Sequence, residues 1–288
     1  MGNNLRLIKT RIKSAKNIAQ ITKAMEMVSA AKMKKAQARL GDSVAYAEKL
    51  HEMMQTLASF VDSSQHPLLY AADNVKSALV VVMSSNKGLA GALNANVFRE
   101  TGKLTREMAT KNMRVDYVSI GRKARDFLRY SKRNLVGVFD GFGDTPHYTQ
   151  IQPIASFVID AFLKREYDVI YFVYPKFVTT LTQKPLVHTL LPVALPKSSA
   201  HDKAVAKPVF EPASEVLLDK LLPYYVEQEL FQFILQSNAS EHSARMIAMK
   251  NATDNAKDVR KELTLEFNTA RQAQITQQIA EIASATMI

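Results

Sequence analysis

The turn Gly88-Leu89-Ala90-Gly91 is the part of the sequence that comes nearest to a ligand-binding motif. It follows an apolar run and precedes a helical pattern, and a glycine turn at a helix N-terminus can bind phosphate through exposed backbone N–H groups. The dinucleotide pattern GxGxxG is absent. The phosphate loop of nucleotide hydrolases is absent too, because Leu104 follows Gly102-Lys103 where that motif needs Ser or Thr. We therefore interpret this stretch as a tight strand-to-helix turn.

No other group of residues has the composition of a catalytic site. Asp140 and Asp144 lie in a glycine-rich loop with no companion base in the sequence, and Ser84-Ser85 has no nearby histidine. The six histidines are scattered at spacings that do not suit a metal ion, and there are no cysteines for disulfides, thiol catalysis or metal binding. The sequence predicts no catalytic residue, no cofactor and no metal site.

Positive charge is concentrated near the N-terminus. The chain has a net charge of +11, and residues 1–40 hold ten Lys or Arg and a single acid, Glu26, whereas residues 212–288 hold seven bases and ten acids. Such a segment can face nucleic acid, anionic lipid or an acidic protein, or simply water. No aromatic residues interleave with these bases for base stacking, so we do not predict nucleic-acid binding.

Glycine and proline divide the chain into three predicted domains, 1–66, 67–211 and 212–288. All ten prolines and seven of the nine glycines lie between Pro67 and Pro223. The flanking segments have almost no helix breakers, so each is predicted to be one helix of roughly 85–95 Å. Helices of that length need a packing partner. No apolar run reaches the roughly 18 residues that span a bilayer.

Both outer segments hold a heptad pattern, which is typical of a left-handed coiled coil. The N-terminal seam is Leu5, Ile8, Ile12, Ala15, Ala19, Thr22, Glu26, Ser29, Met33, Ala36, Leu40, Ser43, Ala47, Leu50, Met54, Leu57 and Val61. The C-terminal seam is Leu217, Leu221, Tyr224, Gln228, Phe231, Leu235, Asn238, His242, Arg245, Met249, Ala252, Ala256, Val259, Leu263, Glu266, Ala270 and Ala273.

A chain that reverses through an intervening domain gives an antiparallel helix pair. Both seams have a polar middle, so we align Glu26 with Arg245 as a polar pair. This register also sets Ile12 opposite Val259 and Leu40 opposite Phe231. About 20 residues beyond Glu266 would then project as a lone helix, roughly 30 Å long.

The middle segment alternates between strand and helix patterns, which predicts an α/β domain. The apolar run 78–83 suits a buried parallel strand. The other expected strands are 115–120, 135–139, 168–174 and an edge strand at 186–191, the expected helices are 94–111, 122–130 and 153–164, and 196–212 is expected to be a loop.

A second stripe on the N-terminal helix lies off the seam. It runs through Ile18, Ile21, Met25 and Val28 and continues as the bases Lys32, Lys35 and Arg39. One interpretation is a slightly widened core followed by a solvated face, since methionine often only fills cores. The other is a surface that contacts a third protein.

Three stretches of the sequence resemble a known family. They are ITKAMEMV at 21–28 followed by Lys32-Met33, ARMIAMKNATDN at 244–255 and NTARQAQIT at 268–276. Their order and spacing are similar to those of gamma subunits of the bacterial F-type ATP synthase. The resemblance covers essentially the whole chain.

The resemblance implies an α+β fold in which a long antiparallel coiled coil joins a central Rossmann-like α/β domain. It implies a non-catalytic rotor shaft that couples proton flow to the conformational cycle of the catalytic beta subunits. Its partners would be three alpha and three beta subunits, epsilon and the c-ring. The chain would lie peripherally at the cytoplasmic face of the bacterial membrane, bound there only indirectly. Contacts with beta would involve Met25, Lys32, Lys35, Arg39, Arg271 and Gln272.

A few positions depart from the family pattern. Gln278 stands where the family usually has glutamate, and Ala285 lies where its tail commonly has glycine. In the central turn, Asn86 and Lys87 replace the more usual aspartate and arginine. These changes are mild and leave the expected fold intact. The cysteine-bearing redox segment of chloroplast members is not apparent.

Overall fold

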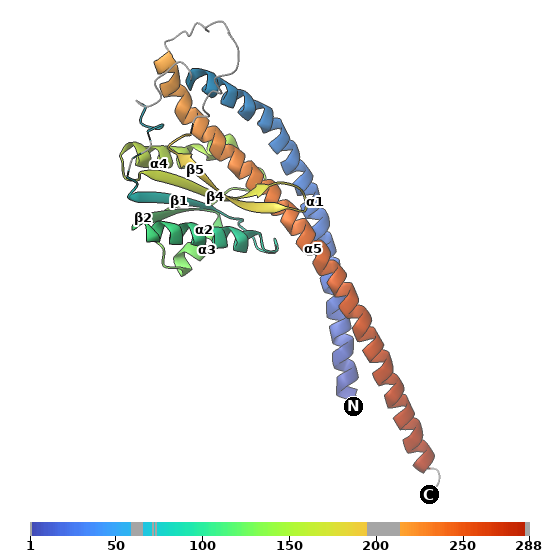
Figure 1. The fold of residues 1–288 in the computed structure, drawn as a ribbon. Helices are drawn as coiled ribbons and strands as arrows, with labels where there is room; N and C mark the ends of the chain where they lie inside the picture. The colour runs from blue at the N-terminus through green and yellow to red at the C-terminus, as the bar shows by residue number, and fades with distance from the viewer. Residues whose placement is uncertain (1, 59–65, 71, 73, 195–213, 286–288) are drawn as a thin grey trace. The chain divides into compact units, whose positions relative to one another are not determined.

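The computed structural model describes residues 2–58, 66–70, 72, 74–194 and 214–285. The chain divides into two compact units. We call residues 1–31 with 245–288 the helical unit and residues 32–244 the central unit. Two long helices, α1 (Gly2–Ala58) and α5 (Ser214–Ala285), contribute to both units. Figure 1 labels the elements.

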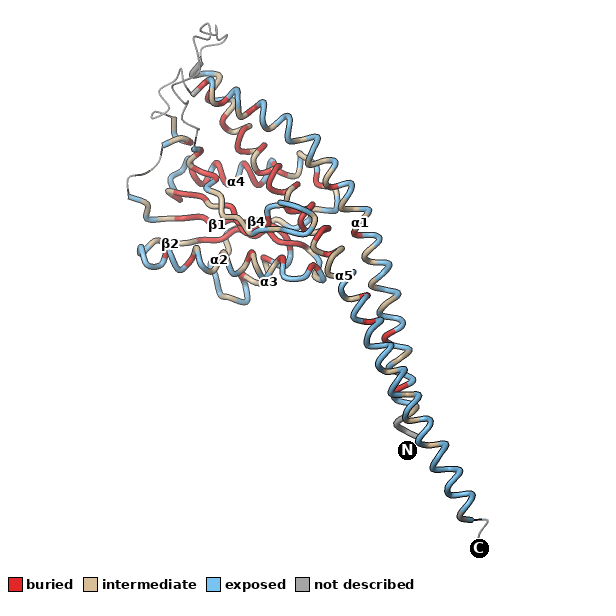
Figure 2. Tube along the Cα trace, turned by 45° about the vertical axis from the view of Figure 1, so that its right-hand side comes forward, coloured by how far each residue is buried: buried red, intermediate tan, exposed pale blue. Residues whose placement is uncertain are grey.

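The predicted seam of α1 is confirmed. Every seam position from Leu5 to Leu57 is buried or half-buried, and Val61 lies outside the described residues. In the helical unit α1 runs antiparallel beside α5 (Figure 1). A single stripe of α5 is covered there, whereas α5 in the central unit is buried on most sides (Figure 2).

Beyond Ala256 the predicted seam of α5 is confirmed at Leu263 and Ala270, which are half-buried, and wrong at the positions between. Val259 is 47% exposed and Glu266 and Ala273 are exposed, whereas Phe267 and Gln274 are half-buried. At Glu266 and Ala273 the covered position is therefore one residue later than predicted. A helix with 3.6 residues per turn drifts against a strict 3.5-residue repeat, and this drift accounts for the change.

The predicted register between the helices is also wrong, by one helical turn. Aligning Glu26 with Arg245 would place Thr22 opposite Met249. Instead the hydroxyl of Thr253 donates a hydrogen bond to that of Thr22, at 2.7 Å. In the central unit, Nε2 of Gln232 likewise bonds to the carbonyl of Ser43, at 2.7 Å. A pattern that repeats every seven residues leaves such a shift undetermined.

The central unit contains a five-stranded sheet in the order β3-β2-β1-β4-β5. Its strands are β1 (Ser77–Met83), β2 (Arg114–Ile120), β3 (Leu135–Phe139), β4 (Val169–Phe177) and β5 (Gln183–Leu191). The first four are parallel, and β5 pairs antiparallel with β4 at one edge. All expected strands are present within three residues of their predicted bounds. The apolar runs of β1 and β4 are mostly buried, as expected of central parallel strands.

Helices cover both faces of the sheet (Figure 1). On one face lie α2 (Leu93–Thr110) and α3 (Arg122–Tyr130), packed on a core that includes Val80 and Val82. On the other lie α4 (Gln152–Leu163), which follows the short 3-10 helix η2 (Tyr148–Gln150), and the N-terminal part of α5. The expected loop 196–212 lies outside the described residues.

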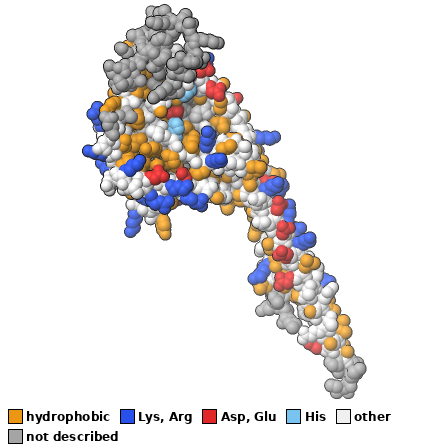
Figure 3. Space-filling model, viewed as in Figure 1, with side chains coloured by type: hydrophobic (Ala, Val, Ile, Leu, Met, Phe, Trp, Pro, Cys, Tyr) orange, Lys and Arg blue, Asp and Glu red, His pale blue; other side chains and the backbone are white. Residues whose placement is uncertain are grey.

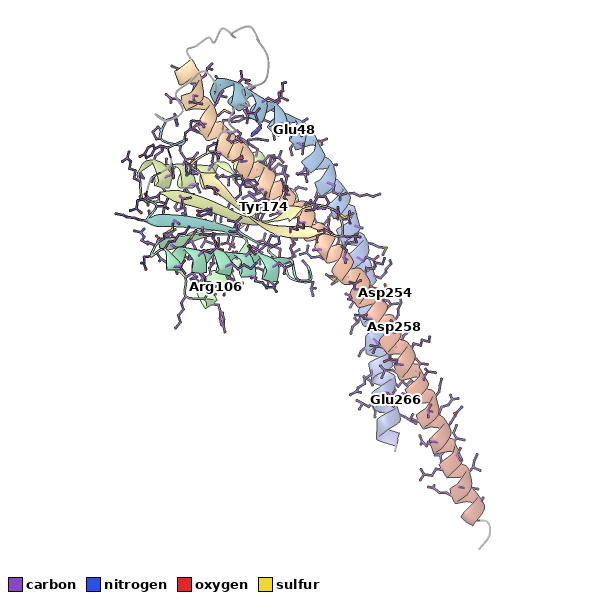
Figure 4. All side chains as sticks on the ribbon, in the orientation of Figure 1. Glu48, Arg106, Tyr174, Asp254, Asp258 and Glu266 are labelled. Atoms are coloured by element: carbon purple, nitrogen blue, oxygen red, sulfur yellow. The ribbon has the colours of Figure 1, made fainter. Side chains whose placement is uncertain are left out.

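The packing of α5 on the sheet is dominated by aromatic rings. Phe233 stacks on Tyr174 of β4 with ring centroids 4.5 Å apart, and its ring lies 5.2 Å from that of Phe172. Figure 4 labels Tyr174 between the sheet and α5. Burying one such side chain contributes about 1.5–3 kcal/mol, so this part of α5 belongs to the core of the central unit.

Candidate functional site

The glycine turn after β1 is closed by its own side chains. Leu89 and Gly91 have φ angles of 62° and 58°, so the chain turns sharply into α2. Oδ1 of Asn94 accepts a hydrogen bond from the backbone N–H of Ser85 at 3.1 Å, and Nδ2 of Asn94 donates to Oγ of Ser85 at 2.7 Å. The backbone N–H of Ser85 is therefore already used within the protein and is not available to a phosphate.

The crevice at the carboxyl ends of the parallel strands is filled by α5. Ligands of Rossmann-like folds bind where the strand order reverses, which here is between β1 and β4. The cavity at this place has a volume of about 30 Å³, and Ile234, Ser237 and Asn238 of α5 line it together with Ser84 and Asn86. That volume suits one water molecule rather than a nucleotide.

Lys32 and Asp144 form an ion pair that the sequence did not suggest. Nζ of Lys32 donates to Oδ2 of Asp144 at 2.6 Å, and Nε2 of the buried His242 lies 3.7 Å from Oδ1. The hydrogen bond from Lys32 lowers the pKa of Asp144. Burial opposes that shift, and the charges of Lys32, His242 and Lys87 add to it. The expectation that Asp144 has no companion base is wrong.

The other carboxylate of this loop is paired as well. Asp140 accepts a hydrogen bond from the guanidinium of Arg125 in α3. Neither carboxylate therefore resembles a general acid or base that waits for a substrate. Both hold a loop against neighbouring elements.

The two other predicted basic contacts in the central unit are accessible to differing degrees. Lys35 is exposed and Arg39 is half-buried. Arg39 lines a shallow cavity of about 330 Å³ with Asp42, Tyr148 and Phe231. Lys35 is thus the member of the basic stripe with the most accessible side chain.

The predicted contacts of the helical unit lie on exposed or half-exposed surface. Met25 is half-buried, whereas its stripe neighbours Ile21 and Val28 are 60% and 54% exposed. Arg271 and Gln272 are both exposed on α5. An apolar stripe left open to water on a long helix is typical of a surface that another protein covers.

The predicted polar pair of Glu26 and Arg245 stays a prediction. Glu26 accepts hydrogen bonds from Nζ of Lys23 at 3.0 and 3.1 Å. Arg245 is 8% exposed and lies in the covered stripe of α5. Burying an arginine is costly unless its charge is compensated, so its position marks a polar layer within the coil.

A network around a buried carboxylate joins β2 to the residues that come just before β3 and β4. Asp116 in β2 is 3% exposed and accepts hydrogen bonds from Nη2 of Arg114 at 2.7 Å, Nδ2 of Asn134 at 2.6 Å and the hydroxyl of Tyr167 at 2.9 Å. Sequence reasoning missed it, because Tyr167 lies 51 residues away. No short-range spacing could have identified it.

Charged side chains are distributed differently over the two units (Figure 3). Arg106, Arg122 and Arg129 are exposed on α2 and α3, and Arg106 points away from the sheet (Figure 4). In the helical unit, the exposed side of α5 carries Asp254 and Asp258 (Figure 4). The central unit therefore presents a basic face on α2 and α3.

Two classes of site have no counterpart in the described residues. None of the described helices is long and apolar enough to cross a membrane. Within the same ranges, no three His, Cys, Asp or Glu side chains are grouped as ligands for a metal ion.

Comparison with known proteins identifies the family. The family model described as ATP synthase matches residues 4–287. An ATP synthase gamma chain from Roseiflexus castenholzii is 43% identical over 280 residues, covering 97% of this chain and 96% of the relative. One from Xanthomonas campestris pv. campestris is 42% identical over 281 residues, covering 97% of each chain.

Solved structures share the fold. A chain of the Euglena gracilis mitochondrial ATP synthase has a TM-score of 0.68 at 18% identity, covering 100% of this chain and 95% of that chain. A chain of the Tetrahymena thermophila mitochondrial ATP synthase central stalk and c-ring has a TM-score of 0.61 at 25% identity, covering 81% and 99%. With a matching family model and relatives that share more than two fifths of its residues over nearly its full length, the chain belongs to the ATP synthase gamma chain family.

Proposed function

We propose that this gamma chain is the central rotor shaft of a proton-translocating ATP synthase and has no catalytic activity of its own. The observation that carries the proposal is the pairing of two very long helices with a Rossmann-like unit whose ligand crevice is filled by one of them. The helices have 57 and 72 residues, or about 85 and 108 Å at 1.5 Å per residue. Helices of this length suit the transmission of torque better than the catalysis of a reaction.

The partners follow from this role. Three alpha and three beta subunits surround the coil, and epsilon and the c-ring bind at its other end. Rotation of the shaft forces the beta subunits through different nucleotide affinities in turn. The two gamma chains compared above are bacterial, which supports a place at the cytoplasmic face of the cell membrane. It is held there peripherally, through the c-ring.

Contacts with beta are assigned to Met25, Lys32, Lys35, Arg39 and the pair Arg271 and Gln272. The exposed Lys35 and the exposed Arg271 and Gln272 support this assignment. Lys32 also donates to Asp144, so part of its hydrogen-bonding capacity is used within the chain. The segments 1–66, 67–211 and 212–288 serve as first coil helix, central domain and second coil helix.

A rotation experiment tests the proposal directly. The chain has no cysteine, so one cysteine placed at Tyr130, which is 90% exposed, carries an optical probe at a single position. The assembled alpha–beta–gamma complex is fixed to a surface through its beta subunits. We expect the probe to turn in one direction when ATP is added and to stay still with ADP.

Stoichiometry is the matched measurement. A tagged chain should co-purify with alpha and beta at one copy for three of each, and with one epsilon. A complex that hydrolyses ATP while the probe stays stationary would contradict the rotor role. So would a gamma chain present at three copies per complex.

A further inference from the structure

The loop 140–147 joins β3 to η2 and is held by several distant elements. Nδ2 of Asn86, in the turn after β1, donates to the carbonyl of Phe142 at 2.7 Å, and Nδ2 of Asn238 in α5 lies 3.4 Å from the carbonyl of Gly143. Arg125 of α3 holds Asp140 at the start of the loop. The loop is therefore fixed to the sheet, to α3 and to α5.

Asp144 is the residue of this loop whose carboxylate lies near a charged or titratable side chain of each long helix. Its Oδ2 accepts from Nζ of Lys32 in α1 at 2.6 Å, and its Oδ1 lies 3.7 Å from Nε2 of His242 in α5. Lys32 is the first residue of the central unit, and His242 lies two residues before Ala244, where the second stretch of that unit ends. Within the central unit, one carboxylate thus binds α1 and lies beside α5.

These contacts differ in how far water reaches them. The side chains of Lys32 and Asp144 are 38% and 49% exposed, while that of His242 is 2% exposed. An ion pair this exposed adds little to stability by itself. Its position matters more than its energy, because the loop that carries it is already anchored through Asn86 and Asn238.

We propose that Asp144 is a positioning residue that couples the rotation of α1 and α5 to the central unit. The inference rests on the proposed rotor function. Within the central unit α5 is already fixed by the packing of Phe233 on Tyr174 of the sheet, so a torque on the shaft loads the contacts of α1 as well. Asp144 binds α1 through a charged hydrogen bond with Lys32 and lies beside His242 of α5, so it resists slip of α1 against the loop.

The alternative is that Asp144 only stabilises its own loop. The two roles differ in what is lost with the carboxylate. A loop that merely loosens lowers the amount of assembled complex, whereas slip at the helices lowers proton pumping per ATP hydrolysed. The ratio of pumping to hydrolysis in assembled complex therefore separates them.

The test uses complete ATP synthase in membrane vesicles. We expect Asp144→Asn, which keeps the shape and removes the charge, to assemble, to hydrolyse ATP and to pump two- to fivefold fewer protons per ATP, on the scale of losing one partly exposed ion pair. Asp126→Asn is the matched control. Asp126 is an exposed carboxylate of the same unit that pairs with Arg125 at 3.0 Å, and its loss should leave the ratio unchanged.

A covalent replacement makes the test decisive. In the variant Lys32→Cys/Asp144→Cys, a short bifunctional methanethiosulfonate reagent links the two positions, and the cysteine-free background restricts the reaction to them. We expect the link to restore the pumping ratio and a reductant to lower it again. An unchanged ratio in Asp144→Asn, or no recovery on linking, would overturn the proposal. Failure of the wild-type chain to assemble or rotate would instead overturn the rotor function.

Discussion

The hydroxyl of Thr253 donates a hydrogen bond to the hydroxyl of Thr22 across the two helices of the helical unit, at 2.7 Å. Thr22 in turn donates to the backbone carbonyl of Ile18 at 2.9 Å, so both hydroxyls are used. Thr253 is only 2% exposed. Each hydroxyl also has a carbonyl of its own helix within reach, Met249 for Thr253 at 2.8 Å and Ile18 for Thr22, so the contact favours this alignment by one hydrogen bond between the helices.

The first prediction concerns this register. Cysteines in place of Thr22 and Thr253 should form a disulfide within the chain under mild oxidation. Hydroxyl oxygens 2.7 Å apart keep the two β-carbons within about 5.5 Å of each other, so a small movement brings them into the range of a disulfide. Electrophoresis without reductant measures the link, and the absence of native cysteine removes competing bonds.

A pair from the register predicted by sequence is the control for that experiment. Val259 is 47% exposed, so cysteines at Ile12 and Val259 should link poorly. Efficient linking of this second pair, with none at Thr22 and Thr253, would restore the register that aligns Glu26 with Arg245.

The second prediction is a loss of stability in acid through Asp116. Burial raises the pKa of this carboxyl, but hydrogen bonds from Asn134, Arg114 and Tyr167 outweigh it and hold the pKa below the usual 3.8. A group whose folded-state pKa is depressed stabilises the fold above its unfolded pKa, and that contribution is lost as pH falls through the folded pKa. Urea unfolding should therefore require less urea as the pH falls below about 4.

The variant Asp116→Asn isolates this contribution. At neutral pH it should lower the free energy of unfolding by about 2–3 kcal/mol, because three donors lose a charged acceptor in a buried site. The difference from wild type should shrink as the pH falls, since the wild-type carboxyl then gains a proton. A difference that stays constant with pH would show that shape, not charge, stabilises the site.

The third prediction concerns Lys35, which is exposed, in contrast to Lys32, which is hydrogen-bonded to Asp144. Lys35→Glu should change the free energy of unfolding by no more than about 0.5 kcal/mol, as for an ordinary surface site. It should lower ATP-driven proton pumping more than ATP hydrolysis if Lys35 faces acidic beta loops. Salt should partly restore pumping, since it screens the repulsion of the new carboxylate. Normal pumping in the assembled variant would leave Lys35 as a solvated residue.

The fourth prediction concerns nucleotide binding. The purified chain should neither hydrolyse ATP nor bind it in a calorimetric titration. The reason is that α5 occupies the crevice and leaves a cavity of only about 30 Å³. Mutating Lys87 to Ala in the central turn should therefore leave the titration unchanged. Micromolar affinity for ATP in the wild-type chain would mean that α5 leaves the crevice in solution.

Much of the architecture was determined by the sequence alone. The scarcity of glycine and proline in the outer segments predicts long helices, and the heptad seam of α1 matches its covered stripe at every described position. The apolar run of β1 predicts a strand most clearly, because a parallel strand buried on both faces is nearly continuously apolar. The missing phosphate-binding motif likewise argued against a nucleotide hydrolase.

The tertiary structure alone decided how distant residues meet. Thr22 and Thr253 are 231 residues apart, and Lys32 and Asp144 are 112 residues apart. A repeating pattern specifies which face of a helix is covered but is unchanged when the partner slides by a turn, so register follows from discrete polar contacts. The same is true of Lys32, which the sequence placed on an outward basic stripe. Packing of the loop 140–147 against α1 and α5 supplied the carboxylate that binds it.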